Sequence, residues 1–375
     1  MKKLFNKLKV ITIVGTRPEI IRLSEVIKKC YKHFDHKLIF TNQNYSKELS
    51  EIFFKDLKLK NPEYHLKINN KSVGKFYGDV LIHCEKIFKE EKPNAIIILG
   101  DTNSSIASLV AKRLKIPVFH LEAGNRSFDN NVPEELNRRM VDHISDFNLV
   151  YTHHAKENLI AEGLDRRKIF LIGSPLNEVL INCNKEIQNS KILKKLNLNK
   201  NKYFIVSLHR EENIDNKTKL KDLIESLIEI NKKFKMKIVL TNHPRFNKKN
   251  SFLKNSKDII IHKPFGYYDY MNLQINSFCA LSDSGTISEE SSILKFNAIC
   301  VRNSMERPET LDNGNLILSG VKKENIINSI KLIKNLDKKN LLIPRDYQIK
   351  DTSNRVIKLI QSLSHIKDNW FNIDK

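Results

Sequence analysis

Short apolar runs rich in Ile, Val and Leu alternate with longer amphipathic stretches along most of this chain, and this alternation constrains the fold most strongly. The runs are nearly continuous in apolar residues, as at residues 11–14 and 95–99. Strands of that kind are buried on both faces and are typical of parallel sheets covered by helices on both sides. The pattern therefore predicts an α/β fold built from doubly wound parallel sheets.

The alternation passes along the chain twice and predicts two domains, at residues 1–175 and 176–350. The strands expected in the first cover residues 11–14, 37–41, 95–99, 117–121 and 169–174. The strands expected in the second cover residues 203–208, 237–241, 259–263, 280–282 and 298–302. A chain of 375 residues also exceeds what one core usually holds. We expect ligands outside the carboxyl ends of the strands, in a cleft between the domains.

The net charge indicates which kinds of molecule could bind this chain, and the cysteine content bears on metal binding and on the redox compartment. The chain carries 65 Lys and Arg residues against 43 Asp and Glu residues, a formal net charge of +22. Such an excess suits nucleic acid, acidic lipid or a phosphorylated metabolite, although many lysines fall in Lys- and Asn-rich stretches typical of a solvated surface. No stretch approaches the ~18–20 apolar residues of a membrane span. The 5 cysteines form no CxxC pair, which disfavours a metal site and favours a reducing cytoplasm.

Polar residues follow the expected strands of the first half where these strands end. Arg17 comes two residues after Gly15, whose neighbourhood lacks the other glycines of a G-x-G-x-x-G fingerprint, so NAD binding is disfavoured. Asp101 and Glu122 follow two further strands, and Glu134 opens an expected helix. Carboxylates that converge on one pocket can divide acid and base roles. Helix capping is the alternative role for each of them.

The second half repeats this arrangement. His209 follows the strand at residues 203–208, and His243-Pro244-Arg245 is interpreted as a structural turn. Ser284, Gly285 and Thr286 follow residues 280–282 and precede a helix, where backbone N–H groups could bind a diphosphate. Glu290 could accept hydrogen bonds from a ribose, or the acidic first turn could simply cap the helix.

Seven motifs occur in one order between about residues 10 and 365, and together they closely resemble the non-hydrolysing bacterial UDP-N-acetylglucosamine 2-epimerases. The motifs are Gly15-Thr16-Arg17-Pro18-Glu19, Gly100-Asp101-Thr102, Glu122-Ala123-Gly124, Pro133-Glu134-Glu135-x-Asn137-Arg138, His209-Arg210-x-Glu212-Asn213, Asp283-Ser284-Gly285 and Glu306-Arg307-Pro308-Glu309. The resemblance implies a GT-B fold of two Rossmann-like domains, with a final helix over residues 351–375 that returns to the first. It implies an isomerase that eliminates UDP, forms an enzyme-bound 2-acetamidoglycal and re-adds UDP with C2 inverted. It further implies a homodimer, and no NAD or metal.

The resemblance also implies roles for individual residues. By motif position, Asp101, Glu122 and Glu134 match the acid/base carboxylates of the family, and His209 matches its catalytic histidine. The matching substrate-binding positions are Arg17 near the phosphates, Ser284 and Gly285 in the diphosphate loop, Glu290 at the ribose, Tyr270 near the uracil and Arg307 at the substrate.

Some positions depart from the pattern of enzymes that act on UDP-N-acetylglucosamine. Arg22 replaces a usual Lys, Asn125 a usual Leu, and Thr286 a usual Gly. These residues look more like a branch that converts UDP-2-acetamido-2,6-dideoxy-L-talose to UDP-N-acetyl-L-fucosamine for capsule or O-antigen, so the resemblance predicts that substrate. UDP-N-acetylglucosamine and UDP-2,3-diacetamido glucuronic acid are the alternatives. Gln43-Asn44 lacks the His of the family's allosteric site, which disfavours activation by UDP-N-acetylglucosamine.

Three other classes compete with this interpretation. A GT-B glycosyltransferase would share the phosphate loop but would not need three carboxylates at one sheet edge. A hydrolysing epimerase would release free UDP. A basic nucleic-acid-binding module would need a reading motif or stacking aromatics, which the sequence lacks.

Overall fold

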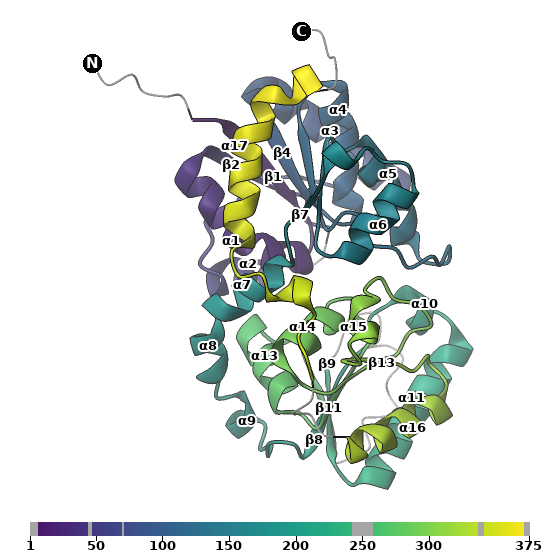
Figure 1. Cartoon of the computed structure of the whole chain (residues 1–375). Coiled ribbons are helices and arrows are strands. Elements are labelled where there is room, and N and C mark those ends of the chain that lie inside the picture. Colours follow the sequence, from purple (N-terminus) through teal and green to yellow (C-terminus); the bar gives the residue numbers. More distant parts are fainter. Residues whose placement is uncertain (1–6, 44–46, 70, 242–257, 337–340, 371–375) are drawn as a thin grey trace. The chain divides into compact units, whose positions relative to one another are not determined.

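The computed structural model describes residues 7–43, 47–69, 71–241, 258–336 and 341–370, which form two compact units (Figure 1). The first unit comprises Met1–Arg126, Val132–Ile181 and Asp346–Lys375. The second comprises Asn182–Arg345 and the short segment Ser127–Asn131. Each unit contains one sheet whose strands pair in parallel. The predicted α/β class with two doubly wound, Rossmann-like domains is confirmed.

The sheet of the first unit has the strand order β3-β2-β1-β4-β5-β6-β7. Its strands are β1 (Lys9–Val14), β2 (Asp35–Phe40), β3 (Tyr64–His65), β4 (Ala95–Leu99), β5 (Val118–Leu121), β6 (Phe147–Val150) and β7 (Ile169–Leu171). The helical elements are α1 (Arg17–His33), α2 (Lys47–Asp56), α3 (Val73–Glu91), η1 (Asn103–Ile106), α4 (Ala107–Arg113), α5 (Pro133–Ile144), α6 (His153–Ala161), η2 (Arg166–Lys168), α7 (Pro175–Asn182), η5 (Arg345–Gln348) and α17 (Thr352–Trp370).

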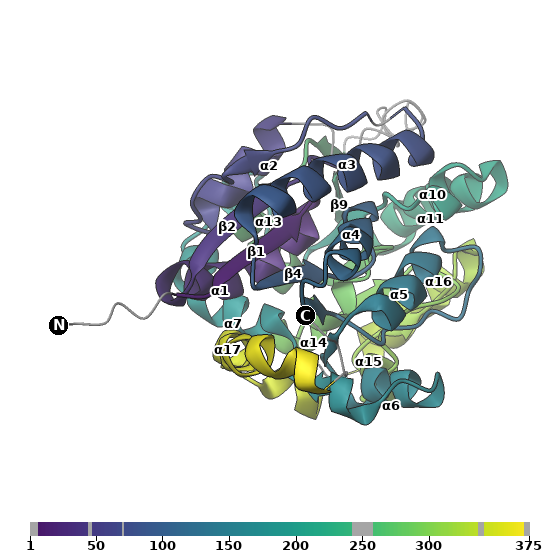
Figure 2. The ribbon, with the colours of Figure 1, turned by 90° about the horizontal axis from the view of Figure 1, so that it is seen from above.

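Helices cover both faces of this first sheet. Ile11 and Ile13 of β1 lie in one apolar cluster with Val80 of α3 and Ala111 of α4. Successive strand residues point to opposite faces, so Val10 contributes to the other side. Figure 2 shows α3 and α17 on opposite sides of the sheet, and α17 packs along α1 (Figure 1). Both faces of the central strands are therefore buried, as their continuous apolar runs predict.

The helix α17 is fixed to the first unit by apolar and polar contacts. Val356, Ile360 and Leu363 are buried and spaced so that they share one helix face. At the helix start, the backbone N–H of Ser353 donates to Oε2 of Glu178 at 2.8 Å, and its hydroxyl donates to Oε1 at 2.5 Å. The last long helix of the chain thus completes the first unit.

The sheet of the second unit has the order β10-β9-β8-β11-β12-β13. Its strands are β8 (Tyr203–Ser207), β9 (Lys237–Thr241), β10 (Ile259–His262), β11 (Cys279–Ser282), β12 (Ala298–Cys300) and β13 (Ile317–Leu318). Its helices are α8 (Asn184–Gln188), α9 (Ile192–Lys195), α10 (Glu211–Ile214), α11 (Lys217–Phe234), α13 (Tyr267–Asn276), α14 (Ile287–Leu294), α15 (Glu309–Asp312) and α16 (Lys323–Asn335).

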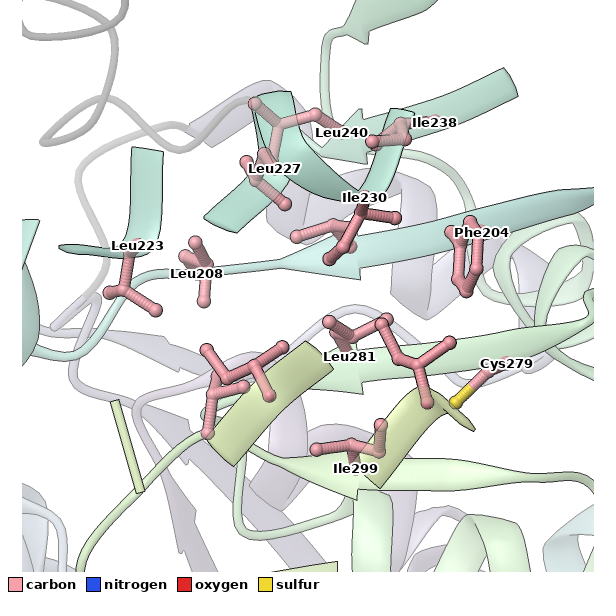
Figure 3. Close-up of a cluster of buried hydrophobic side chains, with 14 of the residues drawn as sticks. Phe204, Leu208, Leu223, Leu227, Ile230, Ile238, Leu240, Cys279, Leu281 and Ile299 are labelled. Carbon is pink, nitrogen blue, oxygen red and sulfur yellow. The ribbon is translucent and has the colours of Figure 1, made fainter. Parts of the chain in front are cut away.

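Strand alternation divides the core of the second unit into two clusters. On one face, Phe204 of β8 and Leu281 of β11 pack with Leu223, Leu227 and Ile230 of α11, as Figure 3 shows. The intervening strand residues pack on the other face with α9, α13 and α14. These two layers hold β8, β11 and β12 side by side, which brings their carboxyl ends to one edge. Among the described residues, no helix is long and apolar enough to cross a membrane.

Candidate active site

Three neighbouring strands of the first unit, β1, β4 and β5, end at the same edge of the sheet. The residues that follow them are Gly15, Gly100 and Glu122. Gly100 has a positive φ of 66°, and a Cβ placed on it would lie 3.7 Å from Oε2 of Glu122. The turn that carries Asp101 therefore lies against the Glu122 side chain, as expected from the sequence for these two carboxylates.

Glu122 is held in an unusual backbone conformation. Its φ is 65°, in the left-handed region that side chains other than Gly, Asn and Asp seldom adopt, and only 6% of the residue is exposed. Its Oε2 forms a buried ion pair with Nη1 of Arg22 on α1, and its Oε1 accepts a hydrogen bond from Nδ2 of Asn125 at 3.4 Å. Such strain, on the order of 1–3 kcal/mol, is typical of functional positions. Arg22 and Asn125, two of the positions that depart from the family pattern, thus both contact this carboxylate.

Asp101 is held by α5. Nη2 of Arg138 lies 2.5 Å from Oδ2 of Asp101, and Nδ2 of Asn137 donates to the Asp101 carbonyl oxygen at 2.9 Å. The Asp101 side chain retains 19% exposure. Glu134 is half-buried in the first turn of the same helix, and its buried neighbour Glu135 pairs with Arg138 at 3.0 Å. The helix that carries Glu134 therefore also positions Asp101.

The turn that carries Arg17 is fixed by Glu19. Oε2 of Glu19 accepts hydrogen bonds from the backbone N–H of Gly15 at 2.9 Å and of Thr16 at 2.6 Å. Its Oε1 accepts one from the hydroxyl of Thr102, in the turn after β4, at 2.9 Å. Burial raises the pKa of Glu19 to about 7, although these hydrogen bonds oppose the rise. Glu19 therefore links two of the strand-end turns.

Arg17 and Gly15 fit tightly into this edge. The guanidinium carbon of the half-buried Arg17 lies 5.8 Å from the centre of the Phe53 ring, at the distance of a cation–π contact. A Cβ on Gly15 would lie 2.1 Å from Oγ of Ser104 and 2.3 Å from Oγ1 of Thr41. Only glycine therefore fits at the start of the Arg17 turn.

The corresponding edge of the second unit is built around Asp283, which follows β11. The buried carboxylate of Asp283 accepts hydrogen bonds from the backbone N–H groups of His209 and Arg210, each at 3.0 Å, and Oδ1 lies 3.0 Å from Nδ1 of the His209 ring. Burial opposes ionisation of Asp283, but the charge and hydrogen bonds of His209 outweigh it and hold the Asp283 pKa below its ordinary value. The other ring nitrogen, Nε2, therefore points away from the carboxylate. The His209 side chain is 37% exposed.

Charged side chains surround Gly285 in the predicted diphosphate loop. A Cβ placed on Gly285 would lie 3.0 Å from Nη1 of Arg307 and 3.5 Å from Oε2 of Glu306. Nη2 of Arg210 would be 3.9 Å from that Cβ. Nε of Arg307 is held by Oε2 of Glu289 at 2.8 Å. Two arginines thus approach the backbone of a glycine, an arrangement suited to an anion.

The other predicted residues of the second unit lie on both sides of this loop. Oγ of Ser284 is 3.0 Å from Oγ1 of Thr286, immediately before α14. Glu290 of α14 is buried and accepts a hydrogen bond from Nε2 of Gln274 at 2.9 Å. Tyr270, on α13, is partly buried and packs against the core cluster on that face of the sheet. The turn predicted at His243-Pro244-Arg245 lies outside the described residues.

Several residues of these two edges were not among the predicted site residues. They are Glu19, Arg138, Arg210, Asp283 and Glu306, and each lies beside a residue that was predicted or beside its turn. Asp283 could have been found by the signal that identified Asp101, because each follows directly on an apolar strand. Arg138 and Arg210 lie in two of the motifs that carry the resemblance, but no local pattern indicates which carboxylate each of them contacts.

Chemically, the two edges differ. The first presents carboxylates with arginine partners, which is a set suited to proton transfer. The second presents a histidine oriented by a buried carboxylate, and cations beside a glycine turn, which is suited to an anionic leaving group. In the part of the chain that the structure describes, no three His, Cys, Asp or Glu side chains are grouped to hold a metal ion.

Comparison with known proteins identifies close relatives. A family model described as UDP-N-acetylglucosamine 2-epimerase matches residues 28–361. A protein of Methanocaldococcus jannaschii named UDP-N-acetylglucosamine 2-epimerase is 41% identical over 348 residues, which cover 88% of this chain and 93% of that protein.

Solved structures give the same result. A structure of a UDP-N-acetylglucosamine 2-epimerase from Rickettsia bellii has a TM-score of 0.90 and 40% identity, and covers 98% of this chain and 100% of its own. A Methanocaldococcus jannaschii UDP-GlcNAc 2-epimerase in complex with UDP-GlcNAc and UDP has a TM-score of 0.89 and 38% identity, and covers 94% of this chain and 99% of its own.

Proposed function

Because this chain belongs to the UDP-N-acetylglucosamine 2-epimerase family and is an isomerase of that type, we propose that it inverts C2 of a UDP-N-acetylhexosamine by eliminating and re-adding UDP. The observation that carries the proposal is the placement of Asp101 and Glu122 at one sheet edge, each against an arginine side chain. Inversion at C2 requires proton removal on one face of the sugar and proton delivery on the other, so it requires two positioned acid/base groups.

The proposed reaction has two halves. In the first, a carboxylate of the first unit removes the C2 proton, the C1–O bond to UDP breaks, and a C1–C2 double bond forms. In the second, a protonated group delivers a proton to the opposite face of C2 while a UDP oxygen attacks C1. Asp101, Glu122 and Glu134 are the proposed groups, and each proton removed is balanced by one returned.

We assign the leaving UDP to the strand ends of the second unit. Developing negative charge on the diphosphate is stabilised by preorganised donors and cations, and Arg307, Arg210 and the turn at Ser284–Thr286 supply these. Glu290 is the proposed ribose ligand, Tyr270 the proposed neighbour of the uracil, and Arg17 a further phosphate ligand. His209, with Nδ1 held by Asp283 at 3.0 Å, is the proposed acid that assists the leaving oxygen.

The first substrate we propose is UDP-N-acetylglucosamine, giving UDP-N-acetylmannosamine. Its support is the 41% identity to a protein named for that substrate and the 38% identity to one whose structure holds UDP-GlcNAc. The second candidate is UDP-2-acetamido-2,6-dideoxy-L-talose. It is favoured by Arg22 and Asn125, which both contact Glu122 and both depart from the usual residues.

Proton NMR in D₂O separates these candidates. The purified protein is incubated with each UDP-sugar alone, and deuterium incorporation at C2 is followed. We expect exchange with UDP-N-acetylglucosamine; exchange with the L-talose nucleotide alone would reverse the order of the two substrates. Stoichiometric accumulation of free UDP would instead indicate a hydrolysing enzyme. Exchange with neither nucleotide, nor with UDP-2,3-diacetamido glucuronic acid, would contradict the epimerase proposal and favour a transferase.

A further inference from the structure

A chain of charged groups, of which only Glu162 is partly exposed, lies beneath the strand-end turns of the first unit. His120, the third residue of β5, is fully buried, and its Nδ1 lies 2.9 Å from Oδ1 of Asp142 on α5. Oδ2 of the same carboxylate lies 2.7 Å from Nη1 of the buried Arg126. Arg126 continues to Glu162, with Nε and Nη2 at 2.8 and 2.6 Å from its two oxygens. None of these residues was predicted as part of the site.

Both nitrogens of the His120 ring face oxygen acceptors. Nδ1 faces the Asp142 carboxylate at 2.9 Å, and Nε2 lies 3.0 Å from the backbone carbonyl oxygen of Gly100. A neutral imidazole has one N–H, so one of these close contacts would bring two lone pairs together. A ring with two N–H groups donates to the Gly100 carbonyl and places its positive charge 2.9 Å from the Asp142 carboxylate. The cations His120 and Arg126 then face the anions Asp142 and Glu162, and the exposed Arg139 is a further cation beside Glu162, at 3.3 Å.

A second buried histidine of the same sheet provides the contrast. Nε2 of His36 on β2 lies 2.8 Å from the hydroxyl of Thr12, which can donate as well as accept. Burial, together with the charge of Lys60, lowers the pKa of His36 to about 3. His36 is therefore neutral at pH 7 and forms no link to the strand-end turns.

The His120 chain connects the three segments that carry the predicted carboxylates. Gly100, whose carbonyl faces His120, is joined by that peptide to Asp101. Asp142 accepts a hydrogen bond from the backbone N–H of Gly124 at 3.2 Å, two residues after Glu122. Asp142 also lies on α5, the helix of Glu134 and of the Arg138 that pairs with Asp101. This group of charges thus contacts the turns after β4 and β5. It also contacts α5, the helix between β5 and β6.

We propose that His120 is a positioning residue of this enzyme, a cationic imidazole that ties the Asp101 peptide and the Glu122 turn to α5. It contacts neither substrate nor reacting atoms and acts through Asp101 and Glu122. This inference rests on the proposed function only for its effect on turnover. The protonation of the ring is a separate property of the folded protein.

The protonation is tested by NMR of protein labelled with ¹⁵N-histidine, using spectra that correlate ring nitrogens with ring carbon-bound protons. His120→Asn and His36→Asn identify the two resonance sets by their disappearance. At pH 7 we expect two protonated nitrogens for His120 and one for His36. In Asp142→Asn, the His120 ring should lose its second proton. A His120 ring with one unprotonated nitrogen in the wild-type protein would overturn the proposal.

The positioning role is tested by kinetics. Asn at position 120 keeps a donor near Asp142 but is too short to reach the Gly100 carbonyl. We expect His120→Asn to lower kcat by about tenfold or more, because misplacement of catalytic groups by about 1 Å has effects of that order or larger, with KM nearly unchanged. His36→Asn, also a loss of a buried ring, should keep kcat per folded molecule.

Outcomes of the two tests are distinguishable. If the wild-type protein epimerises no UDP-sugar, the proposed function fails while the spectra still decide the state of His120. If the wild-type protein is active and His120→Asn loses stability only, to the same extent as His36→Asn and with kcat intact, the positioning role is wrong.

Discussion

At the scale of single residues, the feature that separates Glu122 from the other acidic residues that the structure describes is its backbone conformation. A buried carboxylate at φ 65° persists only where surrounding contacts hold it there. The contacts with Arg22 and Asn125 do so, and the neighbouring Gly124, at φ 79°, continues the turn. The side chain is therefore presented in one orientation before substrate binds, which is what proton transfer from a defined position requires.

Replacing either strand-end carboxylate by its amide should abolish most turnover. Glu122→Gln and Asp101→Asn keep the size of the side chain but cannot exchange a proton, so we expect kcat to fall by ~10²-fold or more. C2 deuterium exchange followed by NMR measures it. Asp146→Asn is the matched control, because Asp146 is also buried but pairs with Lys112 before β6 begins. Near-normal rates in both site variants would exclude this assignment.

Asp283 should hold the His209 ring in one orientation. Asp283→Asn replaces the carboxylate that lies 3.0 Å from Nδ1 of His209 by a neutral amide, which cannot form the same ion pair. We expect kcat to fall by ~10-fold or more, a fraction of the ~10²–10⁴ that a positioned acid or base contributes, and steady-state kinetics measure it. An unchanged kcat, in a variant whose circular dichroism matches the wild type, would contradict the role of Asp283.

At the scale of elements, the first turn of α1 contains a carboxyl group, Glu19, whose titration makes the free energy of unfolding depend on pH. The pKa of Glu19 is raised from 4.5 to about 7, chiefly by burial. The folded protein therefore holds a proton that the unfolded chain releases between these values. The stabilisation is complete below pH 4.5, falls as pH rises, and is lost above about pH 7.

Glu19→Gln removes this titration while its amide oxygen still accepts from the Gly15 and Thr16 N–H groups. The free energy of unfolding of the variant, minus that of the wild type, should increase between pH 5 and pH 8 by up to about 3 kcal/mol, at about 1.4 kcal/mol for each pH unit. Urea titrations at several pH values measure it. A difference that stays constant with pH would show that Glu19 is ionised throughout this range.

The sequence predicts the secondary-structure elements better than it predicts which side chains pair with one another. Apolar runs such as Ala95–Leu99 identify strands because burial on both faces is a local property, and the ends of parallel strands then identify Asp101 and Glu122. The pairs that hold these acids are not local. Arg22 lies 100 positions before Glu122, and no periodicity links them. Strand β3, only Tyr64–His65, is too short to produce a pattern.

At the scale of the whole molecule, the first unit depends on a helix from the other end of the chain. Ile360 of α17 is completely buried, while Lys358 on the same helix is exposed. Ile360→Ala should lower the free energy of unfolding by about 2–5 kcal/mol, the usual range for such a truncation in a core. Lys358→Ala is the control and should change it by less than about 0.5 kcal/mol. Equal effects of the two substitutions would show that α17 is not part of the core.

The first unit begins near Lys9 and is completed only by Thr352–Trp370, with Asn182–Arg345 belonging to the second. During synthesis on the ribosome, all of the second sheet has therefore emerged before the first sheet can receive its last covering helix. The unit that carries Asp101 and Glu122 is the earlier one to be translated and the later one to finish folding. Until Thr352–Trp370 has left the ribosome, the apolar face of α1 that it covers is open to chaperones, and a product cut short after Arg345 would contain the complete second sheet and an unfinished first unit.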